Sequence, residues 1–369
     1  MGEPDDAAAK IWQTAEQFVT LREVEAAARS VIEPGAWNFL EGGAGDERTL
    51  AANAAAFDRW QFRPRFMTGI SRPVTTTTFL GVALATPVYV APFGFDRLFH
   101  TDGHKAVALG AAASGAMHIV PEMASFTLED IATVGGSAPR TFQLVPIGDD
   151  DHVLKMAGRA VDAGYDAICV TVDTAMPGWR ERSMEDRFVP DMASALANYG
   201  PGTGMDVSVV SDLVTFARPL WTWDRLRDVL SSLTIPWMVK GVLTGDDAAL
   251  AVDAGASAVL VSNHGGRQLD RSPAALNQLR EVVDAVASRA EVGIDGGVRR
   301  GSDIATALAL GARVVGVGRP VAWGLAADGE AGVGRVLSIL QSELVTTMAL
   351  LGVDAVDNLD ESLLQPAHA

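Results

Sequence analysis

The sequence predicts an α/β protein whose main part is a closed parallel (β/α)8 barrel of the TIM type. Eight short β-rich apolar runs follow one another from Pro87 onward, helical patterns separate most of them, and polar residues cluster where the runs end. An open doubly wound sheet is the alternative, but only a closed barrel brings all eight strand ends to one mouth. The expected strands are 88–92, 117–120, 141–145, 167–173, 237–241, 258–263, 291–295 and 313–318. The helical patterns lie at 104–115, 127–134, 152–163, 245–254, 274–289 and 302–310.

The segment before the barrel, residues 1–86, is predicted to be an N-terminal helical cap. Apolar residues recur at helical spacing over 21–31, Pro34 breaks the pattern, and a second helix begins at Trp37. We expect this cap to pack on the barrel, residues 87–369, so that the two parts form one structural domain overall.

Two further segments depart from the regular β/α period. The connection after the fourth strand takes more than sixty residues, since 237 − 173 = 64, and it includes a Gly/Pro-rich stretch. Loops of this length are usually functional lids or disordered, so we expect a mobile lid around 183–215 and a helix near 222–231. The tail predicts an amphipathic helix over 330–351 that seals the barrel, and a frayed end at 365–369.

Composition limits the classes of partner. The chain has 369 residues, 48% of them apolar, and 29 basic against 46 acidic residues give a net charge of −17, which argues against nucleic acid and anionic membranes. An anionic substrate therefore needs a local positive pocket. The single cysteine, Cys169, excludes an intrachain disulfide and favours a reducing compartment. Neither a signal-peptide pattern nor an apolar run of membrane-spanning length is evident, so we expect a cytoplasmic protein with no membrane partner.

The stretch 259–270, V-L-V-S-N-H-G-G-R-Q-L-D, is the strongest candidate for chemistry. It begins as a buried strand and ends in a polar loop, as expected for the catalytic end of a barrel strand. His264 can take a proton near neutral pH, and Arg267 can bind a carboxylate with two hydrogen bonds. The alternative is a turn with a surface histidine and arginine.

The loops after the last two strands predict a phosphate site. I-D-G-G-V-R-R at 294–300 and G-V-G-R-P at 316–320 both follow a strand and precede a helix. Their glycines expose backbone N–H groups at a helix N-terminus, and Arg299 and Arg319 add positive charge. The alternative is two tight turns with surface arginines.

Together these strings resemble the signature of the FMN-dependent 2-hydroxy acid oxidase and dehydrogenase family, over roughly residues 20 to 355. The stretch A-W-N-F-L-E-G-G-A-G-D-E-R-T-L at 36–50 is similar to the N-terminal segment of that family. The resemblance implies an FMN-binding barrel, a small carboxylate substrate, O2 or another electron acceptor, and a homotetramer. The residues that it assigns to FMN are Ala91, Pro92, Phe93, Gly94, Gln143, Thr171, Lys240, Ser262, Asp295, Gly296, Gly297, Arg299, Gly318 and Arg319.

Several of these assignments also follow from the residue types. Lys240 ends the fifth strand and would place a positive charge beside the flavin, whereas a Schiff-base lysine and a surface lysine are its alternatives. Gln143 and Thr171 lie inside strands, where an unpaired polar group costs about 1 to 3 kcal/mol, so each needs a partner such as the flavin edge or an ordinary core hydrogen bond.

The resemblance also assigns the catalytic roles. His264 removes the hydroxyl proton while the α-hydrogen passes as hydride to flavin N5, or, in the alternative mechanism, it removes the α-proton first. Asp173 orients His264, although it could instead cap a helix. Arg267 and Arg180 hold the substrate carboxylate, and Lys240 completes the catalytic set.

Departures from the family pattern lie on the substrate side. Phe39 and Val145 stand where the family has tyrosines, Pro121 and Glu122 replace a Ser-Ser pair, and Gly94 leaves reactivity with oxygen open. We therefore expect a bulky, mandelate-like 2-hydroxy acid. The predicted substrate-binding residues are Phe39, Met123, Val145, Arg180, His264 and Arg267.

Two rival functions remain at this point. The first keeps FMN but oxidises a specialised biosynthetic intermediate: an amine, a peptidyl or carrier-bound substrate, or a substrate of oxidative decarboxylation. The second is a flavin-free phosphate-binding barrel such as a Lys240 lyase. No cluster of carboxylates and histidines has the spacing of a metal site, so no metal is expected, and His118 is expected to be a core histidine.

Overall fold

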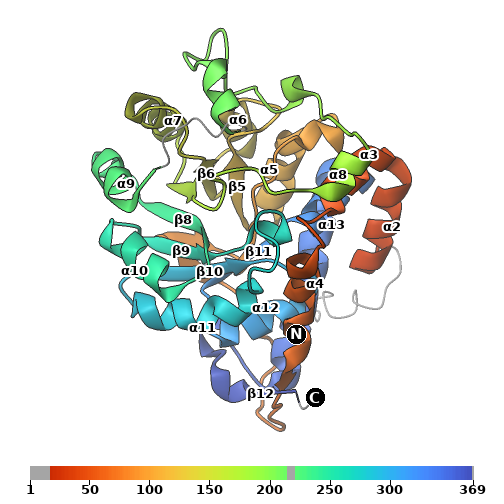
Figure 1. Ribbon diagram of the computed structural model, residues 1–369. Helices are drawn as coiled ribbons and strands as arrows, with labels where there is room; N and C mark the ends of the chain where they lie inside the picture. The colour runs from red at the N-terminus through yellow and green to blue at the C-terminus, as the bar shows by residue number, and fades with distance from the viewer. Residues whose placement is uncertain (1–16, 214–220, 368–369) are drawn as a thin grey trace.

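The computed structural model describes residues 17–213 and 221–367, and its centre is a closed barrel of eight parallel strands (Figure 1). All eight predicted strands are confirmed. The first, β4, pairs with the last, β11, through Val88 and Val315, which closes the barrel and excludes the open sheet. The strands are β4 (Val88–Val90), β5 (Met117–Pro121), β6 (Arg140–Leu144), β7 (Ala167–Thr171), β8 (Trp237–Val242), β9 (Ala258–Val261), β10 (Glu291–Asp295) and β11 (Val314–Val317).

Helices surround this barrel at nearly the predicted positions (Figure 1). Threonine side chains cap several of their N-termini, as Thr127 does for α6 and Thr222 for α9. The long helix α13 has non-helical backbone at Asp328 and Gly329, and its second part is the helix predicted at 330–351. The helices are α5 (Gly103–Ser114), α6 (Leu128–Gly135), α7 (Asp150–Asp162), α9 (Trp223–Leu230), α10 (Gly245–Asp253), α11 (Ala275–Val286), α12 (Gly301–Ala309) and α13 (Arg319–Leu351).

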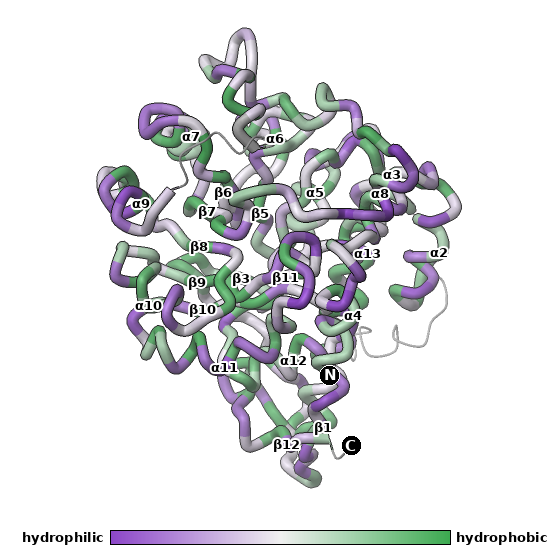
Figure 2. The backbone as a smooth tube through the Cα atoms, viewed as in Figure 1, coloured by the Kyte–Doolittle hydropathy of each residue, from purple (hydrophilic) through white to green (hydrophobic). Residues whose placement is uncertain are grey.

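The barrel interior is a packed apolar core. Tyr89, Met117, Cys169 and Leu260 are all buried in it, and Figure 2 shows the strands as mostly hydrophobic against more polar outer helices and loops. Cys169 is fully buried, as its position on an apolar strand predicted. Burial raises the pKa of its thiol to about 12, so this cysteine is inert.

The cap segment is helical only in its first part. It contains α2 (Leu21–Val31), α3 (Pro34–Glu41) and α4 (Arg48–Ala55), and α2 packs on α13. Pro34 begins the second helix instead of preceding it, because proline fits the first turn, where its missing N–H is not needed.

After residue 59 the cap segment has loops and three short strands, β1 (Trp60–Phe62), β2 (Thr77–Phe79) and β3 (Val82–Leu84), so the prediction of a helical cap was wrong for this part. Residues 1–16 lie outside the described residues. The hairpin of β2 and β3 packs Phe79 and Leu84 into the barrel core. At the hairpin turn the Leu80 N–H donates to the Glu291 side chain, at the first residue of β10, at 2.5 Å. The hairpin therefore covers the N-terminal end of the barrel.

The C-terminal tail is also more ordered than predicted. β12 (Leu364–Pro366) pairs antiparallel with β1 (Trp60–Phe62), with Gln61 opposite Gln365. The expectation of a frayed end was therefore wrong for residues 365 and 366, because a strand of the cap supplies their hydrogen-bond partners. Residues 368–369 lie outside the described residues.

The long connection after β7 passes over the end of the barrel where the strands terminate (Figure 1). It carries a short helix α8 (Glu181–Glu185) and two 3-10 turns, η3 (Met192–Ser194) and η4 (Val207–Leu213). Asn38 of α3 donates to Asp186 at 2.7 Å, which joins this connection to the cap. A mobile lid over 183–215 stays a prediction, and residues 214 and 215 lie outside the described part. None of the described helices is long and apolar enough to cross a bilayer.

Candidate active site

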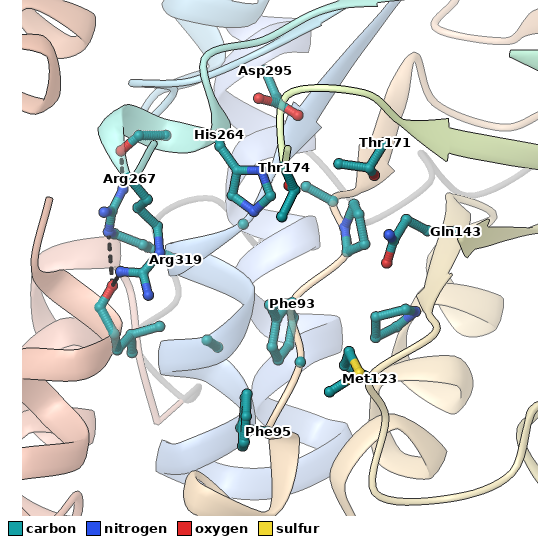
Figure 3. Close-up of a pocket in the computed structure, with 18 of the residues that line it drawn as sticks. Phe93, Phe95, Met123, Gln143, Thr171, Thr174, His264, Arg267, Asp295 and Arg319 are labelled. Atoms are coloured by element: carbon teal, nitrogen blue, oxygen red, sulfur yellow. Dashed lines mark hydrogen bonds between the residues drawn. The ribbon is translucent and has the colours of Figure 1, made fainter. Parts of the chain in front are cut away.

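A cavity of about 660 Å³ lies at the C-terminal end of the barrel strands, where the sequence placed its functional residues (Figure 3). Its volume is typical of a small-molecule or cofactor site, which spans about 300 to 1,000 Å³. Asp173 and Ser262 are not part of the lining, but they contact residues that are. The predicted residues that line the cavity are Phe39, Ala91, Pro92, Phe93, Gly94, Met123, Gln143, Val145, Thr171, Arg180, Lys240, His264, Arg267, Asp295, Gly296, Gly297, Arg299, Gly318 and Arg319.

His264 and Asp173 form a hydrogen-bonded pair at the cavity wall. His264 lies in a left-handed turn directly after β9, with φ +59°, and the Asn263 side chain stabilises this turn by accepting from the Gly266 N–H at 3.1 Å. His264 Nδ1 is 3.0 Å from Asp173 Oδ1, and Thr174 Oγ1 donates to the same oxygen at 3.1 Å. Asp173 therefore fixes the ring through Nδ1 and leaves Nε2 as the nitrogen available to the cavity.

The surroundings of this pair favour a neutral imidazole beside an ionised carboxylate. Burial lowers the pKa of His264, and the charge of Asp173 opposes this only in part. Burial raises the pKa of Asp173, but its interaction and hydrogen bond with His264 and the Lys240 charge outweigh burial, so that the pKa is lowered overall. A neutral histidine that is oriented by a carboxylate can act as a general base at neutral pH.

Lys240 lies at the bottom of the cavity in a buried polar network. Its Nζ is 2.8 Å from Ser262 Oγ and 3.0 Å from Asp295 Oδ2, while Ser262 donates to Asp295 Oδ1 at 2.6 Å and Tyr89 to Asp295 Oδ2 at 3.3 Å. Burial lowers the pKa of Lys240, but the charges of Asp295 and Asp173 outweigh it and raise the pKa overall. Lys240 is therefore an ammonium, whereas a Schiff-base lysine must lose its proton.

The loops after β10 and β11 form the predicted anion cradle. Gly296 and Gly297 have φ of +107° and +83°, and a Cβ at Gly297 would meet the Asn53 carbonyl oxygen at 2.2 Å, so only glycine fits there. Burial lowers the pKa of Arg299, and it lowers the pKa of Arg319 to about 10. Two buried guanidinium groups side by side favour an anion between the cradle and the start of α13.

Arg267 and Arg180 lie near His264, but both also have protein partners. Arg267 donates through Nη1 to the carbonyl oxygens of Phe39 at 2.7 Å and of Gly42 at 2.6 Å, at the end of α3. Arg180 donates to the Arg267 carbonyl oxygen at 3.2 Å and to the Gln268 side chain at 3.1 Å. The two cations thus line the same wall, and Figure 3 shows Arg267 beside Arg319.

Apolar side chains also line the cavity, and the sequence did not predict all of them. Phe95, Phe99, Met192 and Val210 line the cavity together with the predicted aromatic residues, and Phe95 packs edge-on against Phe39 at 5.5 Å between ring centroids. Met192 and Val210 come from the long connection after β7. Their apolar character was visible, but no local pattern shows that this segment folds back onto the mouth.

Glu122 is another residue whose role only the structure reveals. It is 1% exposed, its Oε2 accepts from the Val145 N–H at 2.7 Å, and Tyr199 donates to its Oε1. The Glu122 N–H donates to Gln143 Oε1 at 3.3 Å, which leaves the Gln143 amide NH2 for the cavity. Burial raises the pKa of Glu122 to about 7.

The expectation that His118 is a satisfied core histidine is confirmed. His118 Nε2 lies 3.1 Å from His104 Nδ1, and His104 Nε2 lies 2.7 Å from the Phe93 carbonyl oxygen. Burial lowers the pKa of both histidines, so that the pair is neutral. The histidine pair lies behind the loop that contains Phe93 and holds that loop by a hydrogen bond.

Three features that face one cavity define the class of protein. They are a cradle for a phosphate, a fixed ammonium group and an oriented base. Barrel enzymes that bind a phosphate-bearing cofactor place its phosphate in these last two loops and its reactive part over the barrel centre. The site therefore belongs to a barrel enzyme that binds a phosphate-bearing cofactor and has a general base beside it. Comparison with known proteins gives the particular family.

The family model described as "FMN-dependent dehydrogenase" matches residues 28–366, and the chain belongs to this family. It is 42% identical to the L-lactate oxidase of Nostoc sp., over 94% of this chain and 98% of that protein. It is 40% identical to the 4-hydroxymandelate oxidase of Amycolatopsis orientalis, over 92% of this chain and 96% of that protein. A crystal structure of mandelate oxidase, 38% identical, superposes with a TM-score of 0.86 over 95% of this chain and 99% of that chain. The cofactor is therefore FMN, and the flavin-free alternative is excluded.

Proposed function

We propose that this protein oxidises a 2-hydroxy acid with a bulky apolar side chain to the 2-oxo acid, with His264 as the base. The observation that carries the proposal is the His264–Asp173 pair, which opens onto a cavity lined both by cations and by the apolar side chains of Phe39, Phe93 and Val145. The relatives that are named as oxidases of lactate and of 4-hydroxymandelate support the reaction class.

The residues fit FMN on three grounds of this structure. The cradle at Gly296, Gly297 and Gly318 with the guanidinium groups of Arg299 and Arg319 suits the phosphate, and we assign the ribityl chain to Asp295, which lines the same cavity. Lys240 provides a fixed positive charge at the bottom of the cavity. The amide NH2 of Gln143 and the hydroxyl of Thr171 offer hydrogen bonds to the edge of a flavin ring.

The chemistry divides between cofactor and protein. Bound FMN supplies the two-electron acceptor for the hydrogen on the substrate α-carbon. His264 Nε2 takes a proton from the substrate, and Asp173 stabilises the imidazolium that forms. Arg267 and Arg180 bind the substrate carboxylate and orient the α-carbon, an effect of positioning that can lower the barrier by several kcal/mol.

The apolar wall supports the choice of a bulky substrate. Val145 is smaller than a tyrosine and offers no hydroxyl group, and Phe39 presents a ring without one, so a small acid such as glycolate gains few contacts. An aryl or alkyl side chain instead fills the space among Phe39, Phe93 and Met123. The alternative substrates, such as an amine or a carrier-bound intermediate, are not favoured by the relatives, whose names describe hydroxy acid oxidases.

Three finer properties remain part of the proposal. The electron acceptor is O2, which the oxidase names of the relatives support. The assembly is a homotetramer, which light scattering of the purified protein tests. The location is cytoplasmic, which the single buried Cys169 supports because secreted proteins of this size usually carry disulfides.

The anaerobic visible spectrum of the purified protein tests the function. We expect (S)- or (R)-mandelate to bleach the flavin absorbance, and glycolate to do so at least about tenfold more slowly at equal concentration. His264→Asn is the matched control, since it should bind FMN and stay yellow with either acid. Equal rates with glycolate and mandelate would contradict the proposed preference, and a wild-type protein that no 2-hydroxy acid bleaches would contradict the function.

A further inference from the structure

A second cavity of about 290 Å³ adjoins the active site at the ends of β6, β7 and β8. Three residues, Val145, Thr171 and Thr174, line both cavities, so the two spaces share one wall. The rest of this side chamber is formed mainly by Val172 and Ala175, which follow β7, and by Trp223 and Leu226 of α9.

The shared wall lies directly beside the catalytic pair. Thr174 donates to Asp173 Oδ1, the same oxygen that His264 Nδ1 contacts. Val145 stands opposite on the chain that leaves β6, and its backbone is held by Glu122 at 2.7 Å. A substrate whose α-carbon lies within reach of His264 therefore has its side chain near the wall that Val145 and Thr174 form between the main cavity and the side chamber.

The chamber has the chemistry of a subsite for an uncharged apolar group. Its wall combines valine, alanine, leucine, proline and tryptophan side chains with the hydroxyl-bearing Thr171, Thr174 and Thr222. Among the described residues that line it, the one with a charge is the exposed Asp247 at the start of α10. A carboxylate at the rim disfavours a second negative charge on the ligand. Benzene occupies an apolar protein cavity of about 150 Å³, so a chamber of about 290 Å³ has room for more than one ring.

We propose that this side chamber binds the distal part of the substrate side chain, an uncharged alkyl or arylalkyl group longer than the phenyl ring of mandelate. The proposal rests on the function proposed above, because it needs the carboxylate and the α-carbon to be held in the main cavity. It assigns the preferred substrates to medium-chain or arylalkyl 2-hydroxy acids, and it excludes acids with a second carboxylate at the far end.

The experiment compares short and long acids on one variant that fills the chamber. Ala175 is exposed and lines only the side chamber, so Ala175→Phe should fold normally and occupy that space. Ala26→Phe, at an exposed position of α2 that lines neither cavity, is the matched control. The readout is the anaerobic rate of flavin bleaching divided by the acid concentration, for 2-hydroxybutanoate, 2-hydroxydecanoate and 2-hydroxy-4-phenylbutanoate.

We expect wild type and Ala26→Phe to prefer the two long acids by at least about tenfold, and Ala175→Phe to lose most of that preference. The rate with 2-hydroxybutanoate should stay within about threefold in all three proteins, which shows that the catalytic site is intact. The analogue of 2-hydroxydecanoate that carries a second carboxylate at its far end should be a poor substrate for all three proteins.

The outcomes separate this proposal from the one on which it rests. If none of the acids bleaches the wild-type flavin, the proposed function is wrong. If 2-hydroxybutanoate bleaches it but Ala175→Phe leaves the rates with the long acids unchanged, or lowers all rates equally, the subsite is wrong.

Discussion

Tyr199 donates a hydrogen bond to the buried carboxyl group of Glu122, and this bond joins the connection after β7 to the end of β5. The other oxygen of the carboxyl group holds the Val145 N–H, and Asn198, next to Tyr199, donates to the Glu122 carbonyl oxygen at 2.8 Å. One acidic side chain thus organises part of the cavity wall and the segment that passes over the mouth.

This arrangement predicts a pH-dependent stability that Glu122→Gln removes. Burial raises the pKa of Glu122 from an ordinary value of 4.5 to about 7, so between these values the folded state holds a proton that the unfolded state has lost. The contribution of Glu122 to stability should therefore fall as pH rises from about 4.5 to 7, by about 3 kcal/mol, and then stay level. Urea titrations at several pH values should show this slope in wild type and a smaller slope in Glu122→Gln.

Tyr199→Phe provides the control for that prediction. The Tyr199 hydrogen bond lowers the pKa of Glu122, so its loss should raise this pKa and extend the falling slope to higher pH. If the stability of wild type and of Glu122→Gln depended on pH in the same way, the pKa of Glu122 would not be raised in the folded protein, and the prediction would be wrong.

Asp173→Asn should slow the reaction and move its pH profile. Burial lowers the pKa of His264, so the acid limb of kcat/KM should lie below pH 6.5, and activity should be level above it. Because the Asp173 charge raises the pKa of His264, the asparagine variant should shift that limb to lower pH while reducing kcat by about 10² or more. Stopped-flow bleaching across pH measures both effects, and an acid limb that moves upward would contradict the assigned pair.

The Lys240–Asp295 pair predicts a strong coupling in stability. Lys240→Met leaves Asp295 buried without its 3.0 Å partner, so the free energy of unfolding of the FMN-free protein should fall by about 3 to 5 kcal/mol. Asp295→Asn in the same chain should recover much of this loss. A double-mutant cycle by denaturant unfolding checks the coupling, and additive effects would show that the two charges do not interact.

Val145→Tyr should change selectivity rather than abolish activity. A tyrosine there takes up cavity space beside Thr174 and adds a hydroxyl group for the substrate, so kcat/KM should rise for glycolate and fall for mandelate-like acids. The ratio of the two values should move by about tenfold or more. Val145→Ile, which adds only one methylene group, is the control and should leave the ratio nearly unchanged.

The barrel and its cofactor loops could be predicted because their signals are local. Each strand is an apolar run, and the two consecutive Gly/Arg loops carry the phosphate site within a few residues. The resemblance added the pairing of His264 with Asp173, which are 91 positions apart and 3.0 Å from one another.

The features that escaped prediction depend on contacts between distant segments. In the sequence, Glu122 is only a replacement of a family serine, and its hydrogen bond with the distant Tyr199 is evident only in the structure. The hairpin at 77–84 has strands of three residues, too short for an alternating pattern to be distinctive. The partners of Arg267 at the end of α3 follow from how the cap docks, which no local pattern encodes.

The pairing of β1 with β12 has a consequence for how the chain is made. Residues 60–62, near the start, find their partners only at residues 364–366, and β4 must likewise wait for β11. During synthesis on a ribosome, neither the barrel nor the cap can close until almost the whole chain has emerged, and contacts so distant in sequence make folding slow. The nascent protein therefore carries open strand edges for most of its synthesis time, and such edges can pair with other chains.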